Sequence, residues 1–201
     1  MGHGHGHGHG HSHGDGCDDH DEHPERGVQS SLFDAIDLPH VTCLNEAASG
    51  SIRNVFKPYH EREDRTTWVE SDADEQLIVH IPFTGDVKLK SITVIAEDGD
   101  EHPTRMVAFK NRDDIDFDNA DSAPSDQTWQ MNPDPEGRHP YETLIAKFNG
   151  LRSLTLYFPE CVAGDVTKIY YIGLSGECKT VVRRSLITVA GTFAGTAPAL
   201  L

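Results

Sequence analysis

The chain has 201 residues, a formal net charge of -16 at pH 7 and a hydrophobic content of 36%, which suits one domain with a polar tail. A surface this acidic repels nucleic-acid phosphates and anionic lipid headgroups, so neither nucleic acid nor a membrane is an expected partner. No apolar run approaches the about 20 residues that cross a bilayer, and no secretory signal is visible, so we expect a cytoplasmic and nuclear protein whose four cysteines are free thiols.

Residues 1–27 form a polar, acidic tail that has too little apolar content to fold and is expected to be disordered. Histidine alternates there with glycine or serine, at His3, His5, His7, His9, His11 and His13. Imidazoles bind Zn, Cu and Ni, but a Gly-His repeat does not hold four ligands in a fixed tetrahedron. We expect weak, pH-dependent metal binding by this tail. A purification tag or a solvated tail without a role are the alternatives, and no resident cofactor is predicted.

The body of the chain reads as a succession of short strands. A short helix is predicted from Ser31 to Asp37, and an irregular but ordered segment then extends to about Asp74. Turn-forming clusters separate the predicted strands, which are 76–81, 87–95, 105–110, 127–131, 143–149, 151–158, 167–174, 177–182 and 186–189. Short strands at this spacing, without a long amphipathic helix, predict an all-β antiparallel sandwich or barrel over residues 31–190, followed by a frayed tail at 191–201.

Two groups of charged residues are the candidate partner-binding residues. The acidic group directly precedes the first predicted strand and comprises Glu70, Asp72, Asp74 and Glu75. Carboxylates held at the edge of a sheet either meet a basic partner or prevent edge-to-edge pairing with another sheet. The basic group is Lys88 and Lys90, which alternate with apolar residues in a half-buried strand.

Asp114, Asp116 and Asp118 have the 1-3-5 spacing of an EF-hand calcium loop. Asn119 and Ser125 then occupy the positions where that loop requires glycine and glutamate, so the EF-hand pattern fails. A hydrated loop is the favoured interpretation, and a calcium site in a sandwich loop stays an alternative.

No catalytic constellation is evident in the sequence. Cys43 follows His40 by three residues, but no third group is in evidence to orient the pair, and no GxSxG, P-loop or GxGxxG motif occurs. We therefore expect a protein that is not an enzyme. Trp68, Tyr59 and Trp129 are candidates for sugar binding between aromatic and acidic side chains, so loop-based binding of sugar or calcium is the alternative function.

The segment from Phe56 to Ile92, FKPYHEREDRTTWVESDADEQLIVHIPFTGDVKLKSI, resembles the signature of the PITH domain, the proteasome-interacting thioredoxin-like C-terminal module. HVTCLNE (40–46), EDGDEHP (97–103), RMVAFKN (105–111) and YIGLSGE (171–177) are similar to the same family and occur in the same order. The resemblance covers about residues 31–190, and the His/Gly-rich opening is also similar to single-domain members.

The resemblance implies a jelly-roll β-sandwich similar to galactose-binding-like domains, with no catalytic residues. It also implies an intracellular protein-interaction module, and in the thioredoxin-like members this module docks on the 26S proteasome. The present chain lacks the thioredoxin domain with its CxxC, so redox activity is not implied. We therefore expect a monomeric adaptor that binds a protein partner, with the 26S proteasome as a candidate.

Overall fold

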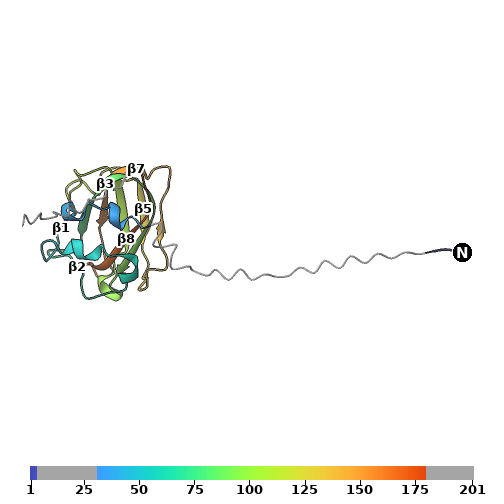
Figure 1. The fold of residues 1–201 in the computed structure, drawn as a ribbon. Helices are drawn as coiled ribbons and strands as arrows, with labels where there is room; N and C mark the ends of the chain where they lie inside the picture. The colour runs from blue at the N-terminus through green and yellow to red at the C-terminus, as the bar shows by residue number, and fades with distance from the viewer. Residues whose placement is uncertain (4–30, 180–201) are drawn as a thin grey trace, which may run out of the picture.

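The computed structural model describes residues 1–3 and 31–179, and this part of the chain forms the predicted all-β antiparallel sandwich (Figure 1). The strands within it are β1 (Thr42–Leu44), β2 (Val69–Glu70), β3 (Leu77–Ala96), β4 (Arg105–Lys110), β5 (Gln127–Gln130), β6 (Tyr141–Glu142), β7 (Asn149–Phe158) and β8 (Lys168–Cys178). Hydrogen-bonded neighbours follow the order β2-β8-β3-β7-β4-β5, and β1 and β6 also pair with β3. No helix in the described part is long and apolar enough to cross a membrane.

Strand β3 contributes to both layers of the sandwich. Its first part pairs with β1 and β7, from Leu77 opposite Phe158 to Pro82 opposite Ser153. Its second part pairs with β8, from Val87 opposite Cys178 to the end of the strand, and with β6. The pairing register shifts between Pro82 and Val87.

The prediction of two strands, 76–81 and 87–95, joined by a turn at Gly85-Asp86 is therefore wrong in one respect. The two stretches form one continuous strand that bends from one layer of the sandwich into the other at this point and changes partners. A glycine next to an aspartate is typical of a turn, but here it marks an irregularity within a strand.

The two termini of β3 lie at the same end of the sandwich. Leu77, at the start of β3, lies opposite Phe158, and Ala96, at its end, lies opposite Ile169. The Thr167 hydroxyl donates to the carbonyl of Glu75 over 2.6 Å, which joins the segment before β3 to the segment before β8. The middle of β3, with Val87 opposite Cys178, lies at the other end.

The core fills the space between the layers. Alternate residues in the first part of β3 contribute to it, and Leu77, Val79 and Ile81 are fully buried. A second, smaller cluster lies on the opposite face of β3, β4 and β7, where the 111–126 segment covers it with Ile115 and Ala120.

Three other predicted elements differ in the structure. Only the 3-10 helix η1 (Phe33–Ala35) forms within 31–37. The stretch 143–149 is not a strand, because Leu144 and Ile145 are 54% and 44% exposed and the amide of Lys147 donates to the Leu144 carbonyl in a turn. Strand β8 continues to Cys178 without the break expected between the predicted strands 167–174 and 177–182, and residues 180–182 lie outside the described part.

The segment up to Asp74 is irregular, as predicted. Its ordered parts are β1, β2 and the 3-10 helices η2 (Leu38–His40), η3 (Ser51–Val55) and η4 (Tyr59–Glu61), and a further 3-10 helix, η5 (Gly99–Glu101), follows β3. The strand predicted at 186–189 and most of the 1–27 tail lie outside the described residues. The proposed domain limits therefore stay predictions.

Candidate interaction site

Carboxylates gather at the end of the sandwich where β3 begins and ends. The loop that contains η5 packs against the loop after β7, where the amide of Val162 donates to the His102 carbonyl over 3.0 Å. Glu70 on β2 lies opposite Lys168, at the start of β8. We call this surface the acidic end, and its half-buried or exposed carboxylates are Glu70, Asp72, Asp74, Glu75, Glu97, Asp98, Asp100, Glu101, Glu160 and Asp165.

Asn45 fixes the shape of the loop that contains Asp72, Asp74 and Glu75. Its side-chain amide donates to the Asp74 carboxylate over 2.9 Å and to the Gln76 carbonyl over 2.7 Å, and its oxygen accepts the amide of Ala73 over 3.0 Å. Asn45 itself has a φ of 68°, a left-handed conformation that asparagine tolerates better than most residues. Sequence reasoning missed this residue, although an asparagine at the end of a short strand is a recognisable signal.

The four predicted acidic residues therefore differ in their surroundings. The Asp74 carboxylate accepts hydrogen bonds from Asn45 and from the amide of Gln76. Asp72 is exposed and Glu75 is half-buried, and both make hydrogen bonds in the loop through their backbones. Asp72 and Glu75 are therefore the better positions for testing surface contact.

Lys88 and Lys90 lie at the opposite end of the sandwich. Both face Glu177 near the end of β8, with Nζ–Oε distances of 3.9 Å from Lys88 and 2.6 Å from Lys90. The hydrogen bond from Lys90 holds the pKa of Glu177 below its usual range. Because Glu177 and Lys168 are nine residues apart in one strand, the lysines are roughly 30 Å from the acidic end. The structure therefore places the two predicted groups on two separate surfaces.

Aromatic rings and cations alternate beside the acidic end. The Lys168 ammonium lies 4.8 Å from the ring centre of Trp68, and the Arg65 guanidinium lies 5.1 Å from that of Tyr170. Glu97 connects these groups, because it accepts the Tyr170 hydroxyl and lies 3.7 Å from the Lys168 ammonium. The hydrogen bond from Tyr170 is the main cause that holds the pKa of Glu97 below its usual range.

Trp68 borders a shallow hollow of about 290 Å³. The indole is 40% exposed, and its N–H donates to the Glu70 carboxylate over 3.0 Å. The hollow is lined by Ala48, Ser51, Asn54, Thr66, Thr67, Trp68 and Glu70. Apart from Glu70, the polar groups of this lining are neutral hydroxyls and an amide.

The other two predicted sugar-binding aromatics do not join Trp68 in this lining. The Arg62 guanidinium covers the Tyr59 ring at 4.3 Å. Trp129 packs against Phe148 with 6.3 Å between ring centres, and its indole N–H donates to the Glu142 carbonyl over 3.0 Å. Both rings are therefore engaged in internal contacts.

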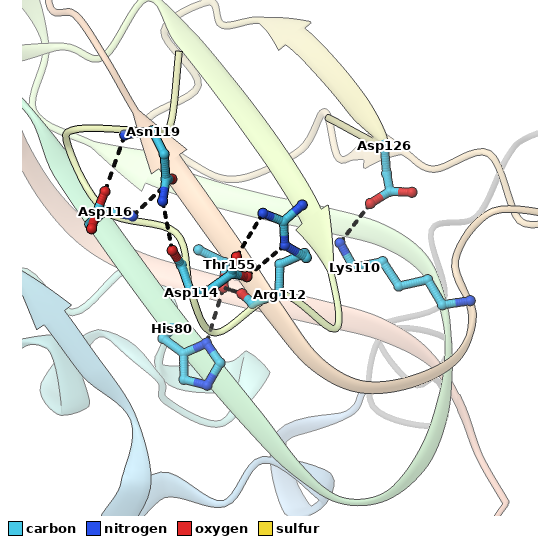
Figure 2. Close-up of polar contacts among 8 residues, drawn as sticks. All are labelled: His80, Lys110, Arg112, Asp114, Asp116, Asn119, Asp126 and Thr155. Atoms are coloured by element: carbon cyan, nitrogen blue, oxygen red, sulfur yellow. Dashed lines mark hydrogen bonds and ion pairs between the residues drawn. The ribbon is translucent and has the colours of Figure 1, made fainter. Parts of the chain in front are cut away.

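The aspartate-rich loop after β4 is held together by its own hydrogen bonds (Figure 2). Arg112 donates to both carboxylate oxygens of Asp114 over 2.6 and 2.8 Å, and this interaction lowers the pKa of that carboxyl. Asp116 accepts the amides of Asp118 and Asn119 over 3.1 Å each. Within the described residues, no group of three histidines, cysteines or carboxylates is placed to hold a metal ion.

His80 belongs to the same region as this loop but faces β7. Its Nδ1 lies 3.0 Å from the Thr155 hydroxyl, and that hydroxyl donates to the Arg112 carbonyl (Figure 2). The Thr155 hydroxyl proton is thus committed to Arg112, so the contact with His80 requires the imidazole to donate. Burial lowers the pKa of His80. These bonds connect β3, β7 and the loop after β4.

Cys43 and His40 do not form a nucleophile-base pair in this structure. The thiol donates to the Leu44 carbonyl over 3.5 Å, whereas the imidazole contacts Asp37 over 2.9 Å. Burial raises the pKa of the Cys43 thiol far above its usual range, so the thiol stays protonated at neutral pH. Cys43 and Cys161 are free cysteines.

Comparison with known proteins identifies the family. The profile of the PITH domain matches residues 22–192. The chain belongs to the PITH domain family. PITH domain-containing protein 1 of Homo sapiens is 44% identical over 180 residues, which cover 89% of this chain and 84% of the human protein. PITH domain-containing protein CG6153 of Drosophila melanogaster is 46% identical over 159 residues, which cover 79% of this chain and 75% of the fly protein.

Solved structures confirm the galactose-binding-like fold of this PITH domain. The CBM32-1 and CBM32-2 domains of Clostridium perfringens ZmpB, in complex with GalNAc, superpose with a TM-score of 0.57 at 10% identity, covering 77% of this chain and 38% of that one. CBM32-3 from a family 31 glycoside hydrolase of the same organism gives a TM-score of 0.51 at 13% identity, covering 76% and 98%. At these identities the likeness concerns the fold alone.

The histidines predicted to bind metal lie mostly outside the described residues, which include only His3 of this set. Metal binding by the tail therefore stays a prediction.

Proposed function

We propose that this PITH-domain protein is a non-enzymatic interaction module whose acidic end docks on a basic surface of a partner protein. The observation that supports this most directly is the separation of charge along the sandwich. Carboxylates outnumber cations at the acidic end, whereas Lys88 and Lys90 lie at the far end beside Glu177. A surface with such an excess of one charge steers a complementary partner and orients it on approach.

The rigidity of the acidic end supports the same proposal. Asn45, Ser71 and Thr167 hold the 71–76 loop by hydrogen bonds, including one of 3.0 Å from the Thr167 amide to the Ser71 hydroxyl. A preformed loop loses little conformational entropy when a partner binds. The 26S proteasome is the first partner to test, because the resemblance of the sequence to the thioredoxin-like PITH proteins implies it. A monomeric state and a cytoplasmic and nuclear location belong to the same proposal.

The test reverses charge at the acidic end without breaking its internal bonds. The Asp72→Lys/Glu75→Lys variant changes outward positions, and the Asp113→Lys/Asp118→Lys variant changes net charge equally on exposed residues of the loop after β4. Tagged forms of both variants and of the wild type are compared by proximity labelling in cells, scored for proteasome subunits and for all other partners.

The proposal expects the first variant to lose the partners that the wild type and the second variant label. The two variants should melt within about 2 °C of the wild type, because surface substitutions of this kind change stability by about 0.5 kcal/mol or less. Equal labelling by all three proteins would refute the acidic end as the contact. Loss of every partner except proteasome subunits would support the surface and reject the proteasome.

A further inference from the structure

We infer that the hollow beside Trp68 receives a single arginine or lysine side chain from the partner, an inference that rests on the proposed function. The first argument is size. At about 290 Å³ the hollow lies at the lower limit of the roughly 300–1,000 Å³ that is usual for small-molecule sites. It therefore suits one side chain inserted from a docked surface better than a large free ligand.

The second argument is the chemistry of the lining. Trp68, which is 40% exposed, forms part of the lining, and the one charged group among the lining residues is the Glu70 carboxylate. Ser51, Asn54 and Thr66 or Thr67 supply additional oxygen atoms. A guanidinium or ammonium group is attracted to the face of a tryptophan and donates hydrogen bonds to carboxylate and hydroxyl oxygens. An anionic side chain would instead meet Glu70 and the potential of the acidic end.

The third argument is that cations of the protein itself already use aromatic faces on this surface. Arg62 covers Tyr59 at 4.3 Å and Lys168 lies 4.8 Å from the Trp68 ring centre. Lys168 is not part of the lining of the hollow, and the nearby Glu97 carboxylate, 3.7 Å away, offsets its charge. The lining itself therefore keeps the negative charge of Glu70.

The position of the hollow connects it to the acidic end. Glu70 ends β2, and the next residues lead directly into the loop that Asn45 fixes, where the amide of Asp72 donates to the Asn45 carbonyl over 3.0 Å. A basic segment that lies along Asp72 and Glu75 could thus insert one side chain beside Trp68. The hollow then selects which basic surfaces bind, beyond the attraction of net charge.

The experiment uses the full chain and a defined probe, the peptide acetyl-Gly-Arg-Gly-Arg-Gly-amide. Its counterpart carries citrulline, which has nearly the shape of arginine without the charge. Binding is followed by NMR chemical shifts of the indole N–H groups and the backbone. The variants are Trp68→Ala and Glu70→Gln, and Leu144→Ala is the matched control because Leu144 is an exposed apolar residue that the hollow does not include.

The inference expects the arginine peptide to shift the Trp68 indole signal and the citrulline peptide not to do so. Trp68→Ala and Glu70→Gln should each weaken binding about three- to tenfold, the size of a partly desolvated cation–π contact or charged hydrogen bond, whereas Leu144→Ala should bind normally. Glu70→Gln keeps an oxygen for the indole N–H, so a folding defect in Trp68→Ala does not decide the result.

Unchanged affinity in both hollow variants overturns the inference, as does a shift of the Trp68 signal by N-acetylgalactosamine but not by the arginine peptide. The proximity-labelling result for Asp72→Lys/Glu75→Lys is independent of this experiment. Loss of labelling there together with normal peptide binding by the hollow variants rejects the hollow alone. Retained labelling there rejects the acidic end, and the inference with it.

Discussion

Replacing Asn45 should loosen the acidic end and destabilise the whole domain. The two protons of its side-chain amide are shared among three oxygens, two of Asp74 and one of Gln76, and its own oxygen accepts the Ala73 amide. This amounts to about three hydrogen bonds, mostly exposed, worth about 2 kcal/mol together. Alanine at φ 68° adds about 1 kcal/mol of backbone strain that glycine does not have.

We therefore expect Asn45→Gly to lower the free energy of unfolding by about 2 kcal/mol and Asn45→Ala to lower it by about 3 kcal/mol. For a domain of this size, these losses correspond to decreases in melting temperature of about 4–8 °C and 6–12 °C. Urea unfolding measures the energies. Hydrogen exchange of the Ala73 amide, which should become faster in both variants, locates the effect.

The comparison of the two variants separates hydrogen bonding from backbone strain. If Asn45→Ala unfolds within about 0.5 kcal/mol of the wild type, the assigned bonds contribute nothing and the loop is held by other contacts. If both variants lose stability but exchange at Ala73 is unchanged, the effect does not arise in the loop. Either outcome would also remove the rigidity argument for docking at the acidic end.

Two further predictions concern the strands that support this surface. Gly176→Ala should lower the free energy of unfolding, measured in urea, by about 3 kcal/mol or more, because an added Cβ would lie 2.1 Å from the Lys88 carbonyl oxygen. The control Gly50→Ala has open space and only the strain of φ 81°, so it should lower this free energy by about 1 kcal/mol. Equal losses in the two variants would contradict the close contact at Gly176. Tyr170→Phe should remove the hydrogen bond that lowers the pKa of Glu97. A carboxyl group whose pKa is lowered by folding stabilises the folded state at pH values above its ordinary pKa of 4.5, and this stabilisation is lost as the pH falls through the folded-state pKa. The stability difference between wild type and Tyr170→Phe should thus be constant near neutral pH and shrink below 4.5, and a difference that stays constant down to about pH 3 would exclude this role of Tyr170.

Most strands could be predicted from local pattern alone. The run RMVAFK was predicted as a strand at 105–110, and β4 has those bounds because its apolar residues are buried on both faces. The stretch 143–149 contains similar residues, yet only Phe148 of its apolar side chains reaches the core. Apolar composition indicates burial on average, but the pairing partners that decide whether a segment becomes a strand are not local.

The charged residues of the proposed site stand out in the sequence, but their arrangement in space does not. The concentration of charge before β3 is visible in the sequence, and so is the alternation of Lys88 and Lys90 with apolar residues. Their separation follows from β3, which bends through both layers and places its middle, with Lys88, at the opposite end from its two termini. Because sequence patterns do not give strand register, the two surfaces could not be told apart before the fold was known.

The structure also bears on why carboxylates are placed beside β2. One reason would be to prevent a free strand edge from pairing with another sheet. Strand β2 has only two residues, and the segment after β1 already covers its outer edge, because Glu46 bridges Ser71 and the amide of Ala47 donates to the Glu70 carbonyl over 2.9 Å. An edge that is already paired does not need charges to protect it. Protection of a free edge therefore does not explain the acidic residues beside β2, and the proposed contact with a basic partner is compatible with their rigid placement.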